Sequence, residues 1–129
     1  MGKFLSDLQV TLKCESCRNG RSEWIVDEPL IYHSNITNKR YTAPKGFITD
    51  FASVPRIPLA YALFGDTIHA PAAIHDWLYS TGIEERPVAD TILREAALAI
   101  RVPKWKGTLI YYAVRLFGSK YYMRQKKDA

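Results

Sequence analysis

The chain has 129 residues, of which 47% are apolar and 24% are charged. This length fits one domain, over residues 1–129, that can bury a core without disulfides or a metal. No apolar run approaches the roughly 18 residues that a membrane span needs. The short apolar stretch at the N-terminus is broken by Asp7. It is not typical of a secretory signal, so we expect neither a signal peptide nor a transmembrane segment.

Positive charge is concentrated toward the C-terminal end. The net formal charge is +5. From Arg101 onward the chain contains eight Lys and Arg residues and only one acidic residue, Asp128. A basic end can bind nucleic acid, anionic lipid or an acidic protein surface, or it can be a solvated helix end that maintains solubility. A nucleic-acid-binding accessory role ranks third among the functions considered, because no recognisable nucleic-acid-binding pattern accompanies the charge.

The first half of the chain is predicted to form short strands. The segment from Phe4 to Leu12 alternates loosely, and two β-prone runs, 24–26 and 30–32, flank a turn at 27–29. Another pair of strands is predicted within 41–48, around a turn at 43–46. Together these segments predict a small antiparallel β-meander.

The two cysteines, Cys14 and Cys17, have the spacing C-x-x-C. One such pair supplies half of a structural zinc site, and no second pair follows it. We therefore expect two reduced thiols near a turn. A metal site shared with His33 is the alternative.

The second half is predicted to be helical. A short helix is expected over 59–64, and a longer one from about Ile68 to Tyr79, with Thr67 as N-cap and Gly82 just beyond its end. Further helices are predicted from Pro87 to about residue 100, and from about 105 to 117 with Gly118 closing it. Strands followed by helices predict an α+β domain, with the meander packed against about three C-terminal helices.

Three polar segments, 46–56, 69–79 and 86–90, carry most of the chemistry. His75 and Tyr79 are four residues apart on a predicted helix and so share a face, whereas Asp76 adjoins His75 and can border the same pocket. Imidazole titrates near neutral pH, and a carboxylate beside it can bind a hard cation or orient a base. This combination favours a metal-assisted or acid–base hydrolytic site.

The predicted site residues share a polar side chain and a place in these segments. They are Asp50, Ser53, His75, Asp76, Tyr79, Arg86 and Asp90. The candidate ligands for a divalent metal, zinc or calcium, are Asp50, His75, Asp76 and Asp90. The structural alternatives are a turn and cap motif at 50–53, an i,i+4 pair at 86 and 90, and a core hydrogen bond for His75. No phosphate-binding glycine loop is present, so no nucleotide cofactor is expected.

Four motifs together resemble the phage and prophage proteins of domain-of-unknown-function family 1353. They are GFITDFASVPR at 46–56, IHDWLY at 74–79, RxxxD at 86–90 and YYAVRLFG at 111–118. The resemblance covers a core of about 41–118, leaves the basic end 119–129 outside, and places the polar signature of the family on the seven site residues. It implies a phage or prophage origin, a virion, tail or lysis role, and a location in the virion or the host cytoplasm.

Two functions follow from this resemblance and from the polar site. The first is a virion-associated protein of the tail or tail tip, whose partners are other phage structural proteins. It would dock through its basic C-terminal helix and the amphipathic rings of Tyr111, Tyr112, Tyr121 and Tyr122. The second is a metal-dependent hydrolase acting on the cell wall or on a related amide or ester, with His75 as base or ligand and Arg86 orienting an anion. The sequence leaves open whether the protein is an enzyme.

Overall fold

The computed structural model of the chain describes residues 2–18, 21–49, 68–119 and 122. In this part of the chain, antiparallel strands come first and helices follow, which confirms the predicted α+β class. The strands are β1 (Lys3–Phe4), β2 (Val10–Arg18), β3 (Arg21–Val26), β4 (Leu30–Ser34), β5 (Lys39–Ala43) and β6 (Ile48–Thr49). The helices are α2 (His69–Thr81), α3 (Arg86–Ala99) and α4 (Lys104–Phe117).

The strands divide into two three-stranded antiparallel sheets, with the orders β1-β4-β5 and β2-β3-β6. The strands predicted to pair around 43–46 therefore lie in different sheets: β5 pairs with β4, and β6 pairs with β3. The segment between them binds to β3 instead, because the Gly46 N–H donates to the Val26 carbonyl at 2.8 Å, and the Val26 N–H donates to the Phe47 carbonyl at 2.9 Å. The chain thus crosses from one sheet to the other.

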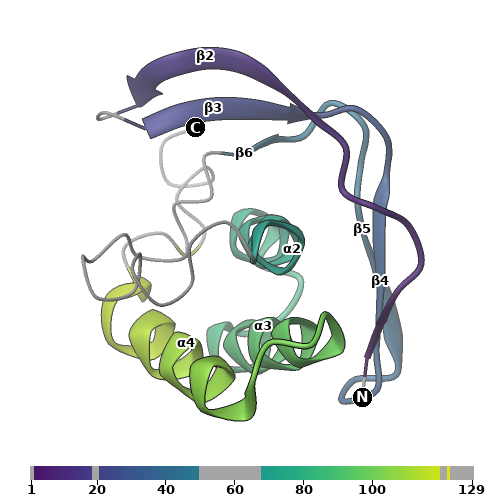
Figure 1. Cartoon of the computed structure of the whole chain (residues 1–129), viewed down its shortest axis with the longest axis vertical. Helices are drawn as coiled ribbons and strands as arrows, with labels where there is room; N and C mark the ends of the chain where they lie inside the picture. The colour runs from purple at the N-terminus through teal and green to yellow at the C-terminus, as the bar shows by residue number, and fades with distance from the viewer. Residues whose placement is uncertain (1, 19–20, 50–67, 120–121, 123–129) are drawn as a thin grey trace.

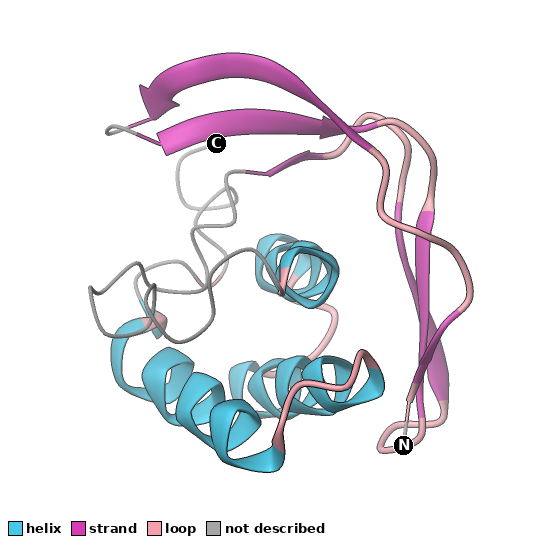
Figure 2. Cartoon of the chain, viewed as in Figure 1, coloured by secondary structure: helices cyan, strands magenta, loops and turns pink. Residues whose placement is uncertain are grey.

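The sheets form two sides of the molecule, and the helices occupy the angle between them (Figures 1 and 2). Side chains alternate along β4, so that Leu30 and Tyr32 are buried on the face that meets the helices. Ile74 and Leu78 of α2 belong to the same core. A second apolar cluster joins α2, α3 and α4.

The helix boundaries agree closely with local sequence signals. Pro87 lies in the first turn of α3, and Gly82 ends α2 in a left-handed conformation with φ 64°, its N–H donating to the Leu78 carbonyl at 3.0 Å. The N-cap position of α2 is held by Ile68, without a side-chain cap. The expected N-cap Thr67 and the expected helix 59–64 lie outside the described residues.

Two further expectations concern the cysteines and the membrane. Cys14 in β2 is disulfide-bonded, so the expectation of a reduced thiol is wrong for this residue. The Cys17 side chain lies outside the described part of the chain. Among the described helices, none has the length and apolar character that crossing a membrane requires.

Candidate functional site

The buried carboxylate of Asp90, in α3, lies where the three helices meet. Its Oδ1 accepts a hydrogen bond from His75 Nε2 at 2.7 Å and another from the Tyr79 hydroxyl, both from α2. Its Oδ2 accepts a hydrogen bond from Arg115 Nη1, of α4, at 2.8 Å. An ionised carboxylate can only accept, so the Nε2 atom of His75 carries a proton. One side chain thereby connects α2, α3 and α4, and we call these four residues and Arg86 the Asp90 cluster.

Arg86 is the member of the Asp90 cluster that binds the end of α4. Its Nη2 donates to the backbone carbonyls of Val114 at 2.8 Å and Arg115 at 2.7 Å. Its Nε donates to the Tyr79 hydroxyl at 3.3 Å and lies 4.0 Å from Asp90 Oδ2. The i,i+4 pair expected from the sequence is therefore present. The guanidinium also satisfies carbonyls near the C-terminus of α4, where cations are favourable.

The electrostatics of the cluster keep Asp90 charged and Tyr79 neutral. Burial acting alone would raise the pKa of Asp90, but the hydrogen bond and charge of His75, with the hydrogen bonds from Tyr79 and Arg115, leave that pKa below its ordinary value. Burial, followed by the hydrogen bond to Asp90, raises the pKa of Tyr79. The carboxylate therefore accepts and the phenol donates at neutral pH.

The second ring nitrogen of His75, Nδ1, is buried and has no hydrogen-bond partner among the described residues. The ring packs on Tyr79, with centroids 4.1 Å apart. Because Nε2 is protonated toward Asp90, a neutral imidazole presents a lone pair at Nδ1, as a metal ligand or a general base does. The His75 side chain is fully buried, so such chemistry requires a metal or substrate to enter the core.

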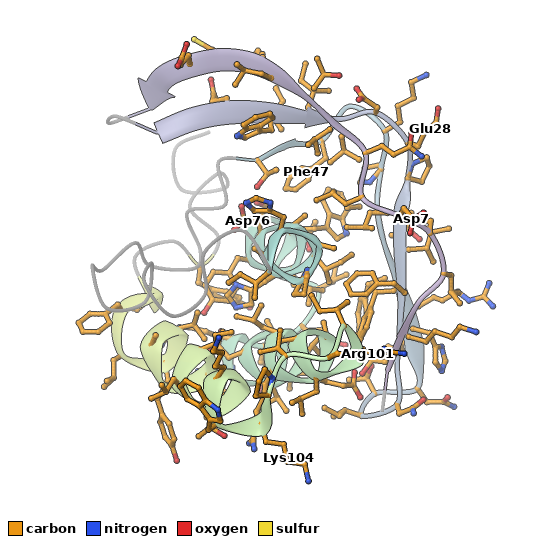
Figure 3. All side chains as sticks on the ribbon, viewed as in Figure 1. Asp7, Glu28, Phe47, Asp76, Arg101 and Lys104 are labelled. Carbon is orange, nitrogen blue, oxygen red and sulfur yellow. The ribbon has the colours of Figure 1, made fainter. Side chains whose placement is uncertain are left out.

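Asp76 faces a different part of the molecule. Its Oδ2 accepts a hydrogen bond from the Thr49 hydroxyl of β6, and both side chains are buried. Figure 3 shows Asp76 on the side of α2 that faces β6 and Phe47. Adjacent helix positions point about 100° apart. The described contacts therefore place Asp76 and His75 in two separate groups, and not around the single pocket expected from the sequence.

Of the seven predicted site residues, the structure brings together His75, Tyr79, Arg86 and Asp90. Asp76 joins β6 instead, and Asp50 and Ser53 lie outside the described residues. Within the described ranges, no three His, Cys, Asp or Glu side chains form a group that could hold a metal ion. The described members of the predicted ligand set thus supply the pair His75 and Asp90, with Asp76 apart from it.

Sequence reasoning missed Arg115 and Glu95. Arg115 was counted with the basic end, and nothing local pairs it with an acid 25 positions away. Glu95 is a second buried carboxylate of α3, which accepts hydrogen bonds from the Tyr32 hydroxyl at 2.6 Å and the Asn35 N–H at 3.1 Å. The sequence could have indicated Glu95, because it lies beside the apolar stripe of α3. A carboxylate buried with that stripe needs hydrogen-bond donors in the core.

Comparison with known proteins found one family. A family model described as "Protein of unknown function (DUF1353)" matches residues 24–114, which is more than half of the chain. The matched region contains every residue of the Asp90 cluster except Arg115, which is the first residue beyond it. It excludes the C-x-x-C segment. Neither the curated proteins nor the solved structures yielded a match.

Proposed function

Because the chain belongs to the family of unknown function DUF1353, and its motifs resemble phage and prophage proteins, we propose that it is a structural component of a bacteriophage particle. It would lie in the tail or tail tip and bind a neighbouring phage protein through α4. The observation that carries this proposal is an exposed row of large apolar side chains along α4.

We call this row the outer face of α4. It consists of Trp105, Leu109, Tyr112 and Leu116, which are 55%, 42%, 58% and 72% exposed. The opposite side of the helix, which packs toward α3, contains Gly107, Ile110 and Val114. A helix with apolar residues on both sides is expected to be covered on both sides. An aligned and exposed apolar row is typical of a protein interface.

The Asp90 cluster supports a binding role because it fixes α4 in place. Arg115 anchors α4 to Asp90 of α3, and Arg86 holds the carbonyls of its last turn. A helix fixed in this way loses little conformational entropy when a partner binds. In this role the cluster supports an interface from inside the molecule, so its side chains do not need to be accessible to the partner.

The proposal is tested by mass spectrometry of purified particles of the phage that encodes the chain. We expect the protein in intact particles at a constant ratio to the other tail proteins, and its absence would contradict the proposal. The double substitution Leu109→Ser and Leu116→Ser should prevent incorporation. The matched control is Ile36→Ser, which alters an isoleucine that is 52% exposed in the β4–β5 turn, and it should be incorporated normally.

A second candidate is a metal-dependent hydrolase of the cell wall or of a related amide or ester. The buried Nδ1 of His75 favours it, because a histidine oriented by a carboxylate through one nitrogen commonly ligates a metal through the other. The test is the zinc and calcium content of protein purified without chelator, with a turbidity assay on cell walls. This function predicts bound metal and wall cleavage, both lost in His75→Ala. No metal and no His75-dependent cleavage would exclude it.

A further inference from the structure

The outer face of α4 has the spacing of a coiled-coil seam. Its members are separated by four, three and four residues. In a heptad, this spacing places Trp105 and Tyr112 at d positions and Leu109 and Leu116 at a positions. At 100° per residue, the four side chains fall within an arc of about 60°. So narrow a row fits one partner helix.

The flanks of this seam carry positive charge only. Lys106 occupies an e position and Arg115 a g position, and α4 contains no Asp or Glu. Lys106 Nζ lies 5.5 Å from the centroid of the Trp105 ring, so the cation borders the seam directly. Arg115 remains 30% exposed although it binds Asp90.

We propose that the partner presents a single α-helix, with its own apolar a/d seam and acidic residues at the e and g positions, and that this helix packs along the outer face of α4. The inference rests on the proposed assembly function and names the class of partner. In coiled coils, charges at e and g positions select the partner. An acidic helix is therefore preferred over a basic one.

Two other occupants fit this surface less well. A second copy of the chain would present the same two cations, Lys106 and Arg115, and no Asp or Glu on its own α4, so it offers no charge complementarity to this surface. An anionic membrane favours a broad apolar face with cations along its border. The four seam residues span only about 60°, as in a helix pair, whereas a helix that lies on a flat surface carries an apolar stripe of about 100°. Phe117, which is 50% exposed in the last turn of α4, lies outside the seam.

The test uses two synthetic peptides of about four heptads, with leucine at a and d and with either Glu or Lys at every e and g position. Like charges keep each peptide monomeric. Fluorescence anisotropy with the full chain at low salt measures both affinities, and sedimentation with phosphatidylglycerol vesicles tests the membrane. We expect the Glu peptide to bind at least about tenfold more tightly than the Lys peptide, a difference of about 1.4 kcal/mol.

Variants of the chain identify the surface. The double substitution Leu109→Ser and Leu116→Ser should abolish binding of the Glu peptide. Lys106→Glu should reduce the ratio of the affinities for the Glu and Lys peptides. Ile36→Ser should change neither the affinity for the Glu peptide nor this ratio. Equal binding of the two peptides, binding of neither, a stronger preference for vesicles, or self-association through α4 would each overturn the inference. If the Glu peptide binds but the protein is absent from particles, only the proposed function fails. If the protein is in particles but the peptides are not distinguished, only this inference fails.

Discussion

His75 Nε2 lies 2.7 Å from Asp90 Oδ1, and neither side chain is exposed to solvent. The contact joins α2 to α3, and Arg115 extends it to α4. Buried ionic groups contribute little net stability compared with an apolar core, but the removal of one partner leaves the others uncompensated. The Asp90 cluster should therefore be sensitive to single substitutions.

The first prediction concerns the charge of Asp90. The Asp90→Asn variant keeps the size of the side chain but leaves Arg115 without its carboxylate partner, so the free energy of unfolding should fall by about 3 kcal/mol. Urea denaturation measures this change. The matched control is Asp27→Asn, because Asp27 accepts from Thr11 at an exposed position. It should cost less than about 1 kcal/mol. Equal losses in the two variants would contradict the prediction.

The second prediction is a dependence on acid. The pKa of Asp90 is lowered in the folded chain, so its stabilising contribution is present above the unfolded pKa of about 3.9 and is lost as pH falls through the folded pKa. Urea midpoints of the wild type and of Asp90→Asn should therefore differ most near neutral pH and converge below about pH 4. A constant difference down to the lowest pH would show that Asp90 is not a charged acceptor.

The third prediction is a dependence on alkali. Burial and the hydrogen bond to Glu84 raise the pKa of Tyr41 to about 12. Because the unfolded pKa is about 10, the stabilisation is complete below that pH and is lost as pH rises toward the folded value. The wild type should lose more stability than Tyr41→Phe over this interval, as measured by urea denaturation at each pH. Parallel curves would exclude the shift.

The fourth prediction contrasts two glycines that are replaced by alanine. A Cβ at Gly2 would lie 1.8 Å from the Tyr32 hydroxyl oxygen and 2.8 Å from Glu95 Oε1. Gly2→Ala should therefore cost about 1–3 kcal/mol by overpacking. At Gly107 of α4 the nearest atom would be Leu98 Cδ2, at 3.4 Å. Gly107→Ala should be neutral or stabilise by up to about 1 kcal/mol, because alanine favours a helix. Thermal unfolding measures both changes: the midpoint should fall for Gly2→Ala, and it should stay the same or rise for Gly107→Ala.

The fifth prediction concerns the end of α4. Nη2 of Arg86 donates to two carbonyls while Nε donates to the Tyr79 hydroxyl, and the single ammonium nitrogen of a lysine cannot make all three contacts with the same geometry. Arg86→Lys should accelerate hydrogen exchange of the amides in the last turn of α4, and the Gly118 N–H, which donates to Val114, is one of them. The exposed Arg40 supplies the control, Arg40→Lys, which should leave these amides unchanged.

The local sequence determined the helices and the contacts within them. Pro87 and Gly82 fix helix ends through their own backbone preferences. Helical periodicity likewise predicted that His75 would meet Tyr79 and that residue 86 would meet residue 90. These relationships depend on φ, ψ and a period of 3.6 residues, so they can be seen without the rest of the molecule.

Only the tertiary structure decided which faces are covered and which distant groups meet. Periodicity places His75 and Asp76 about 100° apart, but it does not show that one faces Asp90 and the other faces Thr49. It also does not show which side of α4 packs on α3 and which stays exposed, because both sides carry apolar residues. Such choices depend on burial and long-range hydrogen bonding, which form between segments far apart in the chain.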